Sequence, residues 1–127
     1  MVVSTGNYFL KWNEFEQNSS STFKDLRNDN DFSDVTLVCD DHHEIKAHKL
    51  ILSTSSTFFD KIFRKNKHPH PLIYMKSVKR RDMVSILDFI YNGEVSIPQE
   101  YLEEFLQVST ELNIKGLDSH EDGIKTN

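Results

Sequence analysis

The chain has 127 residues and a net charge of −5, which predicts one domain with its own core and argues against a surface that grips nucleic acid through its phosphates. Cys39 is the single cysteine, so no internal disulfide can form, and its place in a strand alternation is typical of a buried apolar side chain rather than a nucleophile. No apolar run approaches the roughly 20 residues of a membrane span, and the first residues lack the pattern of a signal peptide, which leaves the cytosol or the nucleus.

The N-terminal pattern predicts a flexible leader over residues 1–7, then a strand over 8–12, then a helix. The strand follows from a short aromatic and aliphatic run, and the helix from Asn13 as an N-cap with Glu16 in the capping-box position. The apolar face of this helix has helical spacing and consists of Phe15, Thr22, Phe23 and Leu26. The nine phenylalanines of the chain exceed what a minimal core needs, which indicates that some serve an interface.

A β-hairpin and a pair of helices are predicted next. Residues 35–39 alternate as a strand does, 40–43 supply an acidic turn, and 44–47 form the returning strand. A short helix begins at about Leu50. A second helix, capped by one of two serines, carries a strongly apolar stripe; the candidate caps are Ser55 and Ser56, and the stripe is Phe58, Phe59, Ile62 and Phe63.

The C-terminal half predicts short strands at 72–75 and 94–97 on either side of a buried helix over 81–92. Gly93 ends that helix, and a last helix starts at Pro98, as expected for these residue types at helix termini. The final polar stretch, 118–127, predicts a disordered tail. Short strands mixed with more numerous helices place the chain in the α+β class.

The histidines and glycines suggest neither a metal site nor a cofactor. His42 and His43 are adjacent, and His68 and His70 are separated only by a proline, so neither pair has the spacing of zinc ligands. The four glycines form no phosphate-binding loop, and no serine lies in a nucleophile elbow. We therefore expect a binding module without a cofactor, and not an enzyme.

Two charged residues lie at the start of apolar elements, and one basic cluster precedes a helix. Asp34 opens the first hairpin strand, and Lys49 opens the helix that follows the hairpin. A capping role for Asp34 and a snorkelling side chain for Lys49 explain both residues, and a functional pair explains them equally well. The basic cluster over 76–81 indicates a solvated turn, with a nuclear-import patch as the alternative.

Several segments, taken together and in this order, resemble a BTB (POZ) domain over residues 8–117. The segments that carry the resemblance are 32–37, 46–49, 52–53, Ser56, 58–59, 86–95 and 112–117. Similarity to the tramtrack group, the insect transcription-factor branch of that family, is carried by 8–13 with Asn18, by His68-Pro69 and by 114–117.

The resemblance implies an α+β BTB fold, with a small, mainly three-stranded sheet flanked by helical hairpins and an extra N-terminal strand and helix at a dimer interface. It implies dimer contacts at Phe9, Leu10, Trp12, Phe15, Phe23, Leu26, Leu50 and Ser53. It implies assemblies larger than a dimer through Tyr8, Phe9, Leu10, Lys11 and Trp12. Asp34 and Lys49 match the family's charged pocket near the dimer centre, where the resemblance implies a buried ion pair.

The implied function is self-association, as a homodimer or higher oligomer, at the head of a longer nuclear regulator of transcription or chromatin. The partner is another copy of the chain; other BTB domains, corepressors or architectural proteins are further candidates, and neither nucleic acid nor a membrane is expected. The alternative is a substrate-adaptor subunit of a cullin-type ubiquitin ligase, which docks the cullin mainly through the helix over 56–63 and its following loop.

Overall fold

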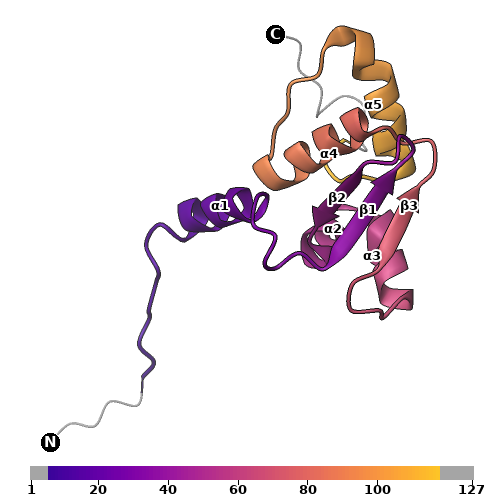
Figure 1. Cartoon of the computed structure of the whole chain (residues 1–127). Helices are drawn as coiled ribbons and strands as arrows, with labels where there is room; N and C mark the ends of the chain where they lie inside the picture. The colour runs from indigo at the N-terminus through magenta and orange to yellow at the C-terminus, as the bar shows by residue number, and fades with distance from the viewer. Residues whose placement is uncertain (1–5, 118–127) are drawn as a thin grey trace, which may run out of the picture.

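The computed structural model describes residues 6–117, which form five helices and three strands (Figure 1). In chain order the elements are α1 (Phe15–Leu26), β1 (Val35–Cys39), β2 (Glu44–Ala47), α2 (Lys49–Ser55), α3 (Thr57–Lys65), β3 (Leu72–Met75), α4 (Arg80–Asn92) and α5 (Gln99–Glu111). Residues 1–5 and 118–127 lie outside the described residues, and with them most of the expected leader and the whole expected tail.

The three strands form one mixed sheet in the order β2-β1-β3, which confirms the α+β class. β1 and β2 are the antiparallel hairpin predicted from the sequence, with Leu37 opposite Ile45. β3 runs parallel to β1, with Leu37 opposite Ile73, so α2 and α3 make the crossover between β2 and β3. Because β1 is the central strand, its Val35, Leu37 and Cys39 side chains are fully buried.

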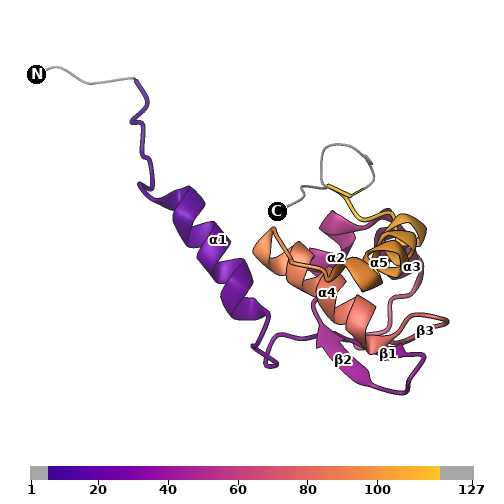
Figure 2. The ribbon, with the colours of Figure 1, turned by 90° about the horizontal axis from the view of Figure 1, so that it is seen from above.

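The core lies between the sheet and helices α2 to α5, which are gathered beside the sheet in Figures 1 and 2. The largest fully buried side chains come from several elements and include Leu37, Leu52, Phe59, Met83, Ile86, Leu87 and Ile114. Burying each such side chain contributes on the order of 1.5–3 kcal/mol. Residues 35–117, called the body below, therefore have a hydrophobic core of their own.

Two predicted helix ends are confirmed in detail. The Ser56 hydroxyl accepts a hydrogen bond from the Phe59 N–H at 3.2 Å, which caps α3, and donates to the Leu112 carbonyl at 2.6 Å. Gly93 ends α4 with φ 85°, a left-handed conformation that glycine adopts without strain. Of the two candidate serines, Ser56 is the cap, and it also ties the start of α3 to the end of α5.

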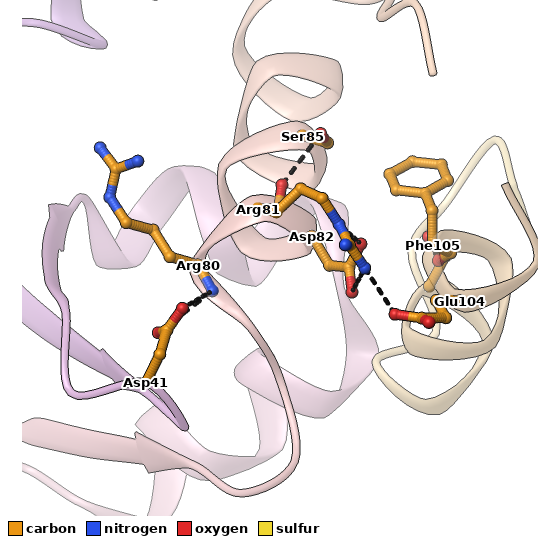
Figure 3. A network of polar contacts seen from close by, with 8 residues as sticks. Asp41, Arg80, Arg81, Asp82, Ser85, Glu104 and Phe105 are labelled. Carbon is orange, nitrogen blue, oxygen red and sulfur yellow. Dashed lines mark hydrogen bonds and ion pairs between the residues drawn. The ribbon is translucent and has the colours of Figure 1, made fainter. Parts of the chain in front are cut away.

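The N-terminus of α4 is held from two sides (Figure 3). On one side, the carboxylate of Asp41 in the hairpin turn accepts from the Arg80 N–H, at 3.2 and 3.3 Å for its two oxygens. On the other side, the Arg81 guanidinium pairs with the Glu104 carboxylate and lies 3.9 Å from the centre of the Tyr101 ring. These contacts fix α4 against both the hairpin and α5.

Two predicted strands are wrong for the single chain. Residues 8–12 are extended without a strand partner, and residues 94–97 form an irregular connection between α4 and α5. A strand forms only where a neighbouring strand takes up its N–H and C=O groups, and neither segment has such a neighbour in the described part of the chain. Val95 and Ile97 nevertheless pack against the core.

The start of α1 also differs from the prediction. Glu14, and not Asn13, precedes the first helical residue, and no side chain caps the helix. Glu14 has a left-handed backbone with φ 70°, which places a turn between Asn13 and the helix N–H groups that Asn13 was expected to cap. From this turn α1 runs apart from the body and contacts it mainly on α4 (Figure 2).

Candidate self-association surface

The N-terminal arm, defined as residues 8–26, presents large apolar side chains to solvent. Phe9 and Leu10 are 87% and 89% exposed, and Tyr8 and Trp12 are exposed beside them. Exposed apolar surface is unfavourable in water, and a contiguous patch of it marks a site of interaction. The segment between 8 and 12 is therefore the strongest candidate for an interface in the described chain.

The apolar face of α1 continues this surface. Phe15 and Phe23 are both exposed, and the rings of Trp12 and Phe15 meet edge to face with 5.4 Å between their centres. Leu26, at the end of the helix, is half-buried and packs against the core. The predicted apolar stripe thus exists, but only its C-terminal end reaches the body.

The last two expected interface positions lie on α2. Leu50 is 76% exposed although the next residues, Ile51 and Leu52, are buried, so its side chain faces away from the core. Ser53 is half-buried. Of the eight positions that the resemblance implies for a dimer, six are exposed in the single chain: Phe9, Leu10, Trp12, Phe15, Phe23 and Leu50.

A polar cluster anchors the end of α1 to the body. The Arg27 guanidinium lies 3.5 Å from the Asp88 carboxylate and over the Tyr91 ring, 5.7 Å from its centre. The Tyr91 hydroxyl accepts from the His48 N–H at 3.1 Å and lies 2.8 Å from its Nδ1, while His48 Nε2 lies 3.2 Å from the Asp29 carbonyl. This polar cluster thus joins the linker after α1 to the start of α2 and to the end of α4.

The hydrogen bonds of this cluster determine the state of its members. Burial raises the pKa of Tyr91 to about 12, so its hydroxyl keeps its proton at neutral pH. Because the Asp29 carbonyl can only accept, His48 Nε2 donates to it, while the second ring nitrogen, Nδ1, shares a hydrogen bond with the Tyr91 hydroxyl. Both ring nitrogens of His48 therefore have hydrogen-bond partners.

Asp34 and Lys49 lie together, but not as the buried ion pair that the resemblance implies. Both residues are half-buried, and their side chains do not pair with each other in the described chain. The Asp34 carboxylate accepts from the Lys49 backbone N–H at 2.7 Å and thereby caps the start of α2. The Lys49 ammonium donates instead to the His68 carbonyl at 3.1 Å, because the loop after α3 brings that carbonyl within its reach.

Reactive side chains are few in the interior of residues 6–117. Cys39 is buried, as predicted, and burial, with a further contribution from the charge of Asp41, raises the pKa of its thiol to about 11. Such a thiol is protonated near neutral pH and is a poor nucleophile. Within the same residues, no three histidine, cysteine or acidic side chains come together as a metal site, and none of the helices is long and apolar enough to cross a bilayer.

Sequence reasoning misses three further exposed apolar side chains, Phe32, Leu72 and Tyr74. Leu72 and Tyr74 alternate along β3 with Ile73 and Met75, which face the core, so they lie on the outer face of the sheet. A short strand that is apolar on both faces is either covered on both sides or leaves one apolar face open. The run of apolar residues over 72–75 was therefore the sequence feature that could have indicated this exposed face.

The family model for the BTB/POZ domain matches residues 23–124. The Drosophila melanogaster protein named "Longitudinals lacking protein-like" is 40% identical over 98% of both chains. Protein tramtrack, alpha isoform, from the same organism is 42% identical over 92% of this chain, and this chain spans 14% of its length. Protein abrupt, also from Drosophila melanogaster, is 40% identical over 87% of this chain and 12% of its own length.

Solved structures show the same fold at lower identity. The BTB domain of zebrafish PATZ1 superposes with a TM-score of 0.73 at 18% identity, covering 88% of this chain and 92% of that one. The BTB domain of human gigaxonin gives a TM-score of 0.72 at 20% identity, covering 90% and 93%. Family model, relatives and fold agree, and the chain belongs to the BTB/POZ domain family, with tramtrack-group proteins of Drosophila among its relatives.

Proposed function

We propose that this chain is a self-association module of a nuclear regulator of transcription or chromatin. One observation carries the proposal: Phe9, Leu10 and Trp12 are exposed on the arm, while the body buries its own core. An apolar arm without cover in its own chain is covered by a second copy related by symmetry. BTB domains are interaction modules that self-associate, which supports this role.

The two unpaired segments, 8–12 and 94–97, offer a means of association. Both have the sequence pattern of a strand, and neither has a strand partner in the described chain. Val95 and Ile97 pack toward the core, so the backbone of 94–97 is held in place beside the body with its hydrogen-bonding groups open. We expect the arm of one copy to add as a strand along 94–97 of the other, and exchange in both directions closes a dimer.

The same arm is our candidate for assemblies larger than a dimer. A strand that pairs along one edge still presents its side chains on two faces and leaves its other edge open. Tyr8 and Lys11, with the rest of residues 8–12, therefore remain available to a third copy after a dimer has formed.

Self-association raises the effective local concentration of whatever the rest of the protein carries. Tramtrack is far longer than the part that matches this chain, so we propose that residues 8–117 are one domain of a longer protein whose other parts bind DNA. Clustering several DNA-binding chains strengthens their binding without any new contact to DNA. Asp34 and Lys49 remain our candidates for a charged pocket in the assembled form.

Hydrogen exchange of the full chain at low and at high protein concentration tests this proposal. We expect the amides of residues 8–12 and 94–97 to become protected as the concentration rises, because they acquire hydrogen-bond partners only in the assembled form. The amide of Leu37 in central strand β1 is the internal control, since its protection comes from the fold of one chain. Exchange that is independent of concentration in both segments would contradict the proposal.

A further inference from the structure

A groove lies between three elements that are distant in the sequence: the end of α1 with its following turn, the edge strand β2, and α4. Figure 2 shows these elements surrounding one region of the molecule. The groove is separate from the exposed apolar positions of the arm, because Phe9, Trp12, Phe15 and Phe23 do not line it. The exposed apolar surface of the arm therefore does not explain the residues that line the groove.

The groove carries an excess of positive charge in a chain whose net charge is −5. Four cations line it, Lys24, Arg27, Lys46 and Arg80, against two carboxylates, Glu44 and Asp88. Asp88 is already 3.5 Å from the Arg27 guanidinium, so the remaining cations exceed the remaining carboxylates. A local reversal of the overall charge creates a potential that attracts acidic ligands.

Three of these cations have no acidic partner among residues 6–117. The ammonium groups of Lys24 and Lys46 are exposed and enter no ion pair there, and neither does the guanidinium of Arg80. Figure 3 shows the Arg80 side chain directed away from Asp41, whose carboxylate bonds only the backbone N–H of this residue. The three charged groups are therefore free to meet a ligand.

β2 adds an open row of backbone groups to the same groove. It is an edge strand, paired only with β1. The Cys39 N–H donates to the His43 carbonyl at 2.9 Å, so the backbone groups of His43 face β1. In an antiparallel pair the backbone groups of every second residue face the neighbouring strand, and those between face away from it. Glu44 and Lys46 therefore direct their N–H and C=O groups away from β1. An extended chain can bond to such an edge and lengthen the sheet.

We propose that this groove binds an extended acidic segment of another protein, which adds as a fourth strand along β2 and places carboxylates against Lys24, Lys46 and Arg80. The backbone groups of β2 complement a peptide backbone, and the surplus cations complement acidic side chains. A nucleic acid fits less well, because it has no peptide backbone that could pair with the open edge of β2. The proposal does not depend on self-association.

The test uses a fluorescent peptide of alternating threonine and glutamate, titrated with the full chain at low ionic strength. We expect saturable binding that weakens as salt is added. Reversing two groove cations together, Lys46→Glu with Arg80→Glu, should weaken binding at least about tenfold, because exposed charge contacts contribute modestly one by one. The matched control is Lys61→Glu with Lys65→Glu, which changes the charge equally on α3, outside the groove, and should leave the affinity unchanged.

A second peptide separates strand addition from simple charge attraction. The same sequence with methylated backbone nitrogens keeps its carboxylates but cannot donate hydrogen bonds to β2, so we expect its affinity to fall at least about tenfold. Melting curves verify that every variant is folded. Absence of saturable binding, equal binding of the methylated peptide, equal loss in the control variant, or displacement of the peptide by a single-stranded oligonucleotide at equal concentration would each overturn the proposal.

Discussion

Large apolar side chains of the kind that the body buries in its core are exposed to solvent in the arm. In the body, Phe59 of α3 is fully buried in the core, whereas in the arm Leu10 is 89% exposed. The body has a sheet whose central strand is paired on both sides, and the arm has an extended segment that is paired on neither. The difference shows that contacts within one chain specify the body, while residues 8–12 of the arm have no strand partner and little cover in the described part of their own chain.

The largest expected effect is in the body. Phe59→Ala should lower the free energy of unfolding by about 3–5 kcal/mol, because it leaves a cavity between α3 and the rest of the core. Unfolding by urea, followed by circular dichroism, measures the loss. Phe32→Ala is the matched control, since this exposed phenylalanine lies outside both regions, and its effect should stay below about 0.5 kcal/mol. Equal losses in the two variants would contradict the division into body and arm.

In the arm, the double substitution Phe15→Ser with Phe23→Ser should act on association and not on folding. Burial of each phenylalanine in the assembly should contribute about 1.5–3 kcal/mol to the free energy of association. Without both side chains, the dissociation constant should rise at least about a hundredfold. Sedimentation measures association, and near-ultraviolet circular dichroism verifies the body. A variant that associates like the unmodified chain would show that α1 is not part of the interface.

Alkaline pH should weaken the body. The pKa of Cys39 is raised from 9.0 to about 11, and that of Tyr91 from 10.0 to about 12, chiefly by burial. Both groups are held neutral in the fold, so their contribution is complete below pH 9 and is lost as the pH rises through this range. The free energy of unfolding should fall by at most about 1.4 kcal/mol per pH unit for each group.

Cys39→Val isolates one of these two contributions. The variant should lose less stability than the unmodified chain between pH 9 and 10, where the thiol ionises in the unfolded state but stays protonated in the fold. Urea unfolding at a series of pH values gives both curves. Parallel curves over this interval would show that the thiol does not contribute.

The smallest expected effect concerns the cap at the start of α2. Asp34→Asn keeps an acceptor for the Lys49 N–H but removes its charge, so we expect a loss of about 0.5–1 kcal/mol, measured by thermal melting. Lys49→Gln should cost less, because the ammonium bonds an exposed carbonyl. Asp31→Asn removes a charge at an exposed site nearby and is the control. If Asp34→Asn melted like Asp31→Asn, the cap would be irrelevant to stability.

The sequence predicts best what local residues decide. The hairpin of β1 and β2, the cap at Ser56 and the glycine end of α4 at Gly93 depend on residues a few positions apart, and all three are present. The BTB family follows from several short segments between 32 and 117, and the similarity to its tramtrack group follows in part from residues 8–13. These features required no knowledge of how the elements pack.

The features that could not be predicted depend on partners distant in the chain or in another chain. Strands at 8–12 and 94–97 need an edge that one copy does not supply. The bond from Asp34 to the Lys49 N–H depends on how the hairpin returns to α2. The cluster of Arg27, Tyr91 and His48 depends on where α1 meets α4, which no local pattern encodes.

The most direct test of the central claim is the mass of the full chain in solution, measured by light scattering over a wide range of concentrations. If the arm is covered by a second copy, the mass should be at least twice the 14.9 kDa of one chain and should fall toward that value on dilution. Removing residues 1–12 should abolish species larger than a dimer and should also weaken the dimer, because it removes the segment that pairs along 94–97 of the other copy. A folded particle of 14.9 kDa at every concentration would contradict the account.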